Sequence, residues 1–98
     1  MVHSFDVAMI LFEKENYKNE KLNIIRDICG LIDKAIAENN NLEFVAEIDN
    51  NNPVLNIIVP HDDDITIYDK WNIGLVSNAK SIDMFLTDEN NICIKITI

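Results

Sequence analysis

Residues 17–39 read YKNEKLNIIRDICGLIDKAIAEN and carry the clearest periodicity in the chain. Its apolar residues recur at steps of three and four, and charged residues fill most of the positions between them. This period is typical of an amphipathic helix that packs one face against a core. We therefore predict a helix that ends in the Asn run beginning at Asn39. Gly30 inside it costs about 1 kcal/mol relative to Ala, which we interpret as a close approach to a sheet.

The segment before this helix, residues 5–12, is apolar at both odd and even positions. A run that is apolar on both faces suits a strand covered on each side, although periodicity alone does not exclude a helix of this length. We predict a central strand here.

The segment after the helix contains a hairpin. Residues 42–49 alternate between apolar and polar side chains, and residues 54–59 form a more apolar run after an Asn-rich turn. Alternation is the period of a strand with one wet face, and the turn residues join two such strands. Residues 65–68 read as a third strand of the same meander.

The C-terminal part contains a second hairpin. Residues 82–87 and 92–98 flank the turn sequence DENN, and the last strand places four Ile residues on one face. Residues 69–81 fit either a short helix or a loop. The predicted fold class is α+β, a mostly antiparallel sheet of about five to six strands with one main amphipathic helix packed on it, in a single domain spanning 1–98.

Composition places the chain among folded proteins, with 48% hydrophobic and 26% charged residues over 98 positions. No basic N-terminal segment precedes an apolar run, and no run is long enough for a membrane span, so we expect a cytoplasmic protein without membrane attachment. Cys29 and Cys93 lack any CxxC spacing, and we interpret both as buried thiols.

The net charge of −9 is concentrated in one part of the chain. Residues 38–69 carry eight acids and no base, whereas the segments on either side are close to balanced. Glu43, Glu47 and Asp49 share the outward parity of one predicted strand, and three further Asp residues fill the turn at 62–64. A solvated, solubilising face is the plain interpretation. The lack of any base favours a functional surface with a cationic partner instead.

Known chemical motifs are missing from this sequence. His61, Asp62, Asp63 and Asp64 are metal-ligand residue types, but adjacent turn residues seldom converge on one ion. No Gly-rich turn accompanies a Ser or Cys. We predict no catalytic residue, metal or cofactor, and hence no enzyme. Direct nucleic-acid binding is disfavoured, because the lysines of residues 14–21 are interleaved with glutamates.

These observations predict a non-catalytic inhibitor that binds a cognate basic protein through an acidic face. The most concrete form is an immunity protein that neutralises a nuclease-type bacterial toxin. The expected contact residues are the acids of the strand and turn with the neighbouring aromatics, where Trp71 is read either as core or as an interface anchor: Glu43, Glu47, Asp49, Asp62, Asp63, Asp64, Tyr68, Asp69 and Trp71.

Two alternatives stay open. The first is a homodimer or other homo-oligomer that pairs through apolar strands, above all residues 92–98, because such a strand must be either central or covered. The second is a small metal-dependent enzyme that uses the turn at 61–64.

Overall fold

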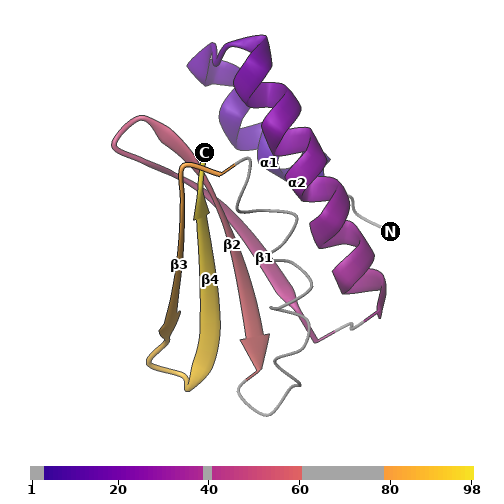
Figure 1. Ribbon diagram of the computed structural model, residues 1–98, viewed down its shortest axis with the longest axis vertical. Helices are drawn as coiled ribbons and strands as arrows, with labels where there is room; N and C mark the ends of the chain where they lie inside the picture. The colour runs from indigo at the N-terminus through magenta and orange to yellow at the C-terminus, as the bar shows by residue number, and fades with distance from the viewer. Residues whose placement is uncertain (1–3, 39–40, 61–78) are drawn as a thin grey trace.

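The computed structural model describes residues 4–38, 41–60 and 79–98 (Figure 1). Helix α1 (Ser4–Phe12) leads through a short 3₁₀ helix, η1 (Glu13–Glu15), to the long helix α2 (Asn19–Glu38). Four strands follow: β1 (Glu43–Asp49), β2 (Asn52–Pro60), β3 (Ser81–Leu86) and β4 (Asn91–Thr97). The predicted α+β class is confirmed.

The four strands form one antiparallel sheet in the order β1-β2-β4-β3. Each hairpin predicted from the sequence is present, and the two hairpins lie side by side through the pairing of β2 with β4. Strand β4 is therefore central, which is one of the two solutions expected for its Ile-rich sequence. Strands β1 and β3 are the two edges of the sheet formed by the described residues (Figure 1).

The predicted amphipathic helix is confirmed as α2, which starts two residues later than expected and ends one residue earlier. Its buried side chains follow the expected spacing and are Ile25, Ile28, Cys29, Ile32 and Ala35. The interpretation of Gly30 is wrong. Gly30 is exposed, and a Cβ built on it would meet no atom within 4 Å. No close approach to the sheet requires a glycine there.

The strand predicted over residues 5–12 is also wrong, because this segment forms helix α1. Its buried residues, Ser4, Ala8 and Phe12, lie four positions apart, which is a helical spacing. The Ser4 hydroxyl donates to the carbonyl oxygen of Cys29 at 3.0 Å, and the Ser4 N–H donates to the Asp33 carboxylate at 2.8 Å. These bonds join α1 to the middle of α2.

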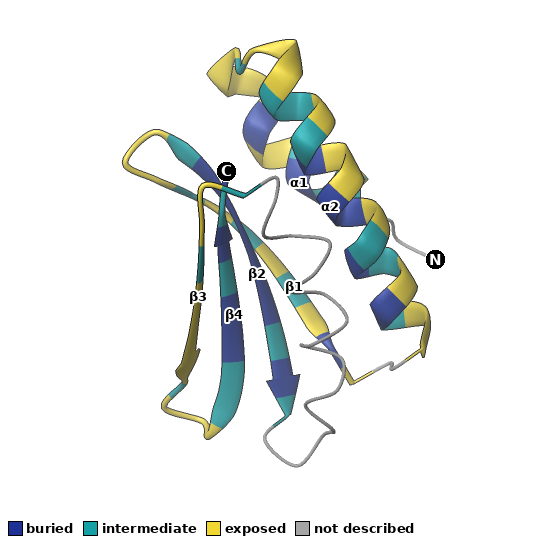
Figure 2. Ribbon diagram, in the orientation of Figure 1, coloured by how far each residue is buried: buried dark blue, intermediate teal, exposed yellow. Residues whose placement is uncertain are grey.

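The core lies between the helices and one face of the sheet. Strands β2 and β4 supply its centre, where Leu55, Ile57 and Ile96 are fully buried. Leu55 lies opposite Ile96, and Ile57 lies opposite Ile94. Figure 2 shows buried residues along β2 and β4, whereas β3 is mostly exposed. The opposite, outer face of the sheet buries a small group of Val54, Asn56 and Cys93.

The described residues form four strands and two α-helices, against the predicted five to six strands and one main helix. One expected strand is helix α1. The strand predicted at 65–68 and most of the segment at 69–81 lie outside the described residues. Within the described ranges, no helix has both the length and the apolar character needed to cross a membrane.

Candidate functional site

The acidic residues of β1 lie on its outer side, as predicted. Along this strand exposed and partly buried residues alternate strictly. The exposed set comprises Glu43, Val45, Glu47 and Asp49, while Phe44, Ala46 and Ile48 pack against the core. The edge position of β1 leaves these carboxylates accessible from the face and from the side of the sheet. We define Glu43, Val45, Glu47 and Asp49 as the acidic face.

Lys95 of β4 lies beside this acidic face, which the sequence reading did not foresee. Its Nζ is 3.2 Å from Asp49 Oδ2, and the two side chains are partly exposed. The hydrogen bond to Asp49 and the negative charges of Asp49, Glu47 and Asp83 raise the pKa of Lys95. A base from elsewhere in the chain therefore neutralises part of the acidic face, and Asp83 of β3 adds a carboxylate on its other side.

The remaining candidate residues lie outside the part of the chain that the structure describes. They are His61, Asp62, Asp63, Asp64, Tyr68, Asp69 and Trp71. Their contribution to a partner surface stays a prediction. In the parts of the chain that are described, no three His, Cys, Asp or Glu residues cluster closely enough to hold a metal ion.

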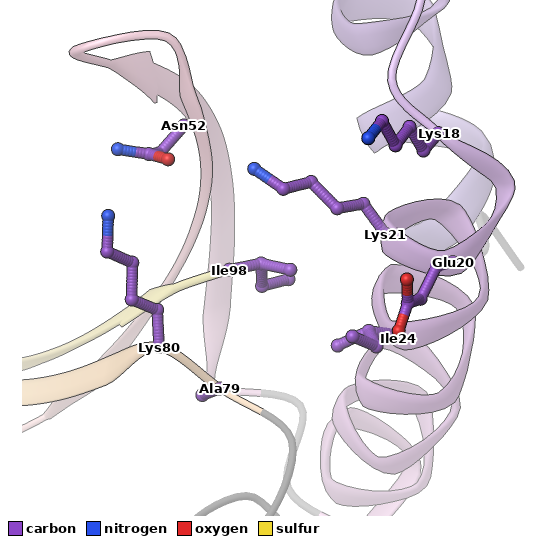
Figure 3. A pocket seen from close by; sticks show the side chains of 8 residues that line it. All are labelled: Lys18, Glu20, Lys21, Ile24, Asn52, Ala79, Lys80 and Ile98. Atoms are coloured by element: carbon purple, nitrogen blue, oxygen red, sulfur yellow. The ribbon is translucent and has the colours of Figure 1, made fainter.

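A basic pocket lies between α2 and the ends of the strands, beside the β1–β2 turn (Figure 3). Lys18 directly precedes α2, Lys21 lies in the first turn of α2, and Lys80 directly precedes β3. In Figure 3 the Lys21 side chain extends from the helix toward Asn52. The cavity holds about 460 Å³ and is lined by Lys18, Glu20, Lys21, Ile24, Asn52, Ala79, Lys80 and Ile98.

This basic pocket was missed because its lysines are scattered in the sequence. Lys18 and Lys21 alternate with glutamates, and Lys80 is contributed by a distant segment. Lys21 is partly held by Tyr17, since its Nζ is 5.7 Å from the ring centroid. The three ammonium groups outnumber the single carboxylate of Glu20, so the lining of the pocket carries a net positive charge.

The edge strand β3 carries an exposed apolar surface. Its exposed fractions are 48% for Met84, 49% for Phe85 and 60% for Leu86. Together with Ile92 these side chains line a shallow hollow of about 210 Å³. The sequence pattern predicts a hairpin for this segment but does not indicate that its apolar side chains are exposed.

The two thiols are buried and free, as predicted. Burial raises the pKa of Cys29 to about 11, although the Ser4 hydroxyl opposes the shift. Burial and the negative charge of Glu47 also raise the pKa of Cys93. A raised thiol pKa means little thiolate at neutral pH, so neither side chain has the properties of a nucleophile.

Comparisons with known proteins find no matching family model, no matching curated protein and no matching solved structure. The surfaces of the chain itself are therefore the basis for a functional proposal. They are the acidic face on one edge of the sheet, the basic pocket, and the apolar edge strand β3.

Proposed function

We propose that this chain is a non-catalytic inhibitor that binds a basic partner protein through the acidic face of β1. The most concrete form is an immunity protein that neutralises a nuclease-type toxin. The observation that carries the proposal is the exposure of Glu43 and Glu47 on the outer side of an edge strand. Among the described residues neither carboxylate has an ion-pair partner, whereas Asp49 is already bonded to Lys95.

The geometry suits recognition of a cationic surface. Strand β1 pairs with β2 along its whole length, which fixes the backbone positions of Glu43 and Glu47. Binding therefore costs only the conformational entropy of the two side chains. Val45 lies between them on the same face and is 46% exposed, which supplies an apolar centre for the contact. Unneutralised carboxylates attract a basic groove and raise the association rate at low salt.

Inhibition then follows from occupancy. A nuclease holds its substrate through Lys and Arg residues that contact phosphates. Carboxylates on the inhibitor pair with those same cations and exclude the nucleic acid by charge and by bulk. The inhibitor needs no reactive group of its own for this mechanism.

The test is a charge reversal with a matched control. We expect Glu43→Lys combined with Glu47→Lys to weaken partner binding roughly 10- to 100-fold, because two attractive contacts become repulsive. Asp27→Lys combined with Glu38→Lys changes the net charge equally on exposed positions of α2 and should leave the affinity within about 3-fold. Partner proteins are recovered from the native host with the wild-type chain, purified, and measured by calorimetry and by nuclease activity.

Salt provides a second readout, since the wild-type affinity should fall as ionic strength rises. Equal affinity of the β1 variant and the wild-type chain for the recovered protein would contradict the proposal. A recovered partner that is acidic, or whose nuclease activity is unaffected by the wild-type chain, would contradict it as well.

A further inference from the structure

We propose that the chain forms a homodimer in which β3 pairs antiparallel with β3 of a second copy, around a twofold axis at Met84. This interface lies on the edge of the sheet opposite β1, so it is independent of the proposed inhibitor surface. It joins the two sheets into one and leaves an acidic face free at each far end.

Within the described ranges, strand β3 lacks the protection that edge strands usually carry. Natural edges are blunted by charged side chains, Pro, bulges or a covering element. The only charge within β3 is Asp83, and the three residues after it are about half exposed or more. Exposed apolar residues on both faces of an edge strand favour pairing with another strand.

The backbone of β3 has its free hydrogen-bonding groups in the positions that such pairing needs. The N–H of Thr87 donates to the carbonyl oxygen of Asn91 at 2.8 Å, so Thr87 faces β4. Hydrogen-bonding direction alternates along an antiparallel ladder, which turns the N–H and C=O groups of Ile82, Met84 and Leu86 toward the open edge. These groups pair with their counterparts in a second copy.

A twofold axis at Met84 makes the strand self-complementary. Met84 then lies opposite the partner's Met84, and Ile82 lies opposite the partner's Leu86, all on the helix side of the sheet. The same register sets Asp83 opposite the partner's Phe85 on the outer face of the sheet. On the helix side, apolar residues therefore meet apolar residues at every position of the strand.

Neighbouring registers lack this match. An axis at Asp83 places two carboxylates directly opposite each other, which is destabilising. An axis at Phe85 places Ile82 opposite the partner's Asp88, which lies beyond the strand, so Ile82 loses its apolar counterpart at each end. The occupant that fits β3 best is thus a second copy in the register centred on Met84.

The first test is sedimentation equilibrium of the wild-type chain over a wide concentration range. We expect the mass to rise from one chain of 11.2 kDa toward twice that value. Met84→Lys places two cations face to face and should raise the dimer dissociation constant at least about 10-fold. Val45→Lys is the matched control, because Val45 is 46% exposed on the other edge strand, and it should leave the dissociation constant unchanged.

The second test fixes the register by cross-linking. Directly opposed residues of a hydrogen-bonded antiparallel pair have Cα atoms about 5.5 Å apart, which is within reach of a disulfide. Met84→Cys should therefore give a disulfide-linked dimer on mild oxidation, whereas Val45→Cys on the other edge strand should stay monomeric. Circular dichroism confirms that each variant is folded. A wild-type monomer at all concentrations up to about 1 mM would overturn the dimer. Equal weakening by Val45→Lys, or no cross-link in the Met84→Cys variant, would overturn pairing through β3 in this register.

Discussion

The two edge strands of the sheet both have one side without a neighbouring strand, but their exposed side chains differ. Strand β1 alternates, with its apolar side chains under the helices and carboxylates on the outer side. Strand β3 is largely exposed on both sides and carries apolar residues there. Charge on an edge strand discourages pairing with a copy of itself, whereas a bare apolar edge invites it. We therefore propose a complementary partner for β1 and a second copy of the chain for β3.

The position of the helices accounts for this difference. Helix α1 packs beside both α2 and β1, so the helical layer covers the β1 side of the sheet (Figure 1). Met84 and Leu86 of β3 point to the same side of the sheet as the core but remain 48% and 60% exposed. Equivalent positions on the two edges therefore have very different environments.

Truncation of one helix-side residue on each edge gives the largest expected contrast. Phe44→Ala in β1 removes a ring packed against the core, and we expect it to lower the free energy of unfolding by about 2–3 kcal/mol. Met84→Ala in β3 should lower it by less than about 0.5 kcal/mol at concentrations where the chain is monomeric. Urea unfolding monitored by circular dichroism measures both. Equal losses would show that the two edges are covered alike.

Sequence reasoning predicted the elements whose period is unambiguous. Helix α2 and strand β1 were predicted because steps of three and four, and strict alternation, each match a single structure. Helix α1 was not predicted, because its apolar residues occur on every side of the helix and give no amphipathic period. One of them, Ile10, is 76% exposed. The signal that could have revealed it was the four-residue spacing of Ser4, Ala8 and Phe12.

The surfaces depend on strand order, which local sequence does not encode. The outward parity of Glu43 and Glu47 was predicted from alternation alone. Lys95 beside Asp49 was not, because the two residues are 46 positions apart and are brought together only by the pairing of the strands. Similarly, nothing local shows that β3 is an edge and β4 is not.

Alkaline pH should destabilise the fold through the buried thiol of Cys29 in α2. The pKa of Cys29 is raised by burial from its ordinary value of 9.0 to about 11 in the folded chain. Its contribution to stability is therefore full below pH 9.0 and is lost as pH rises toward 11. We expect a loss of about 1–2 kcal/mol over this window, and a smaller loss in Cys29→Ala. Identical pH slopes for the two chains would contradict burial of this thiol.

A substitution away from both edges should change stability without changing either surface. Gly30 is exposed within α2 and has room for a side chain, so Gly30→Ala should raise the free energy of unfolding by about 0.5–1 kcal/mol. Partner affinity and dimer dissociation constant should stay at their wild-type values. Thermal unfolding measures the gain in stability. A loss of stability would contradict the open space beside Gly30.

The smallest expected effect is a change in the pKa of Lys95. This side chain interacts with Asp49 of β1 and with Asp83 of β3. Its raised pKa depends most on Asp49 of β1 and least on Asp83 of β3. Asp49→Asn should therefore lower the pKa of Lys95 more than Asp83→Asn does, as measured by NMR titration of the side chain. Because folding raises this pKa, the pairing stabilises the fold below pH 10.5 and is lost as pH rises through the folded value. The reverse order of the two variants would contradict the placement of Lys95.

Hydrogen exchange at single amides tests the contrast between the edges most directly. NMR exchange rates are measured on the wild-type chain at low and at high protein concentration. We predict that the amides of Ile82, Met84 and Leu86 become slower to exchange as concentration rises, while the outward-facing amides of β1 exchange at an unchanged rate. Concentration-independent exchange along β3, or equal slowing on β1, would contradict the account.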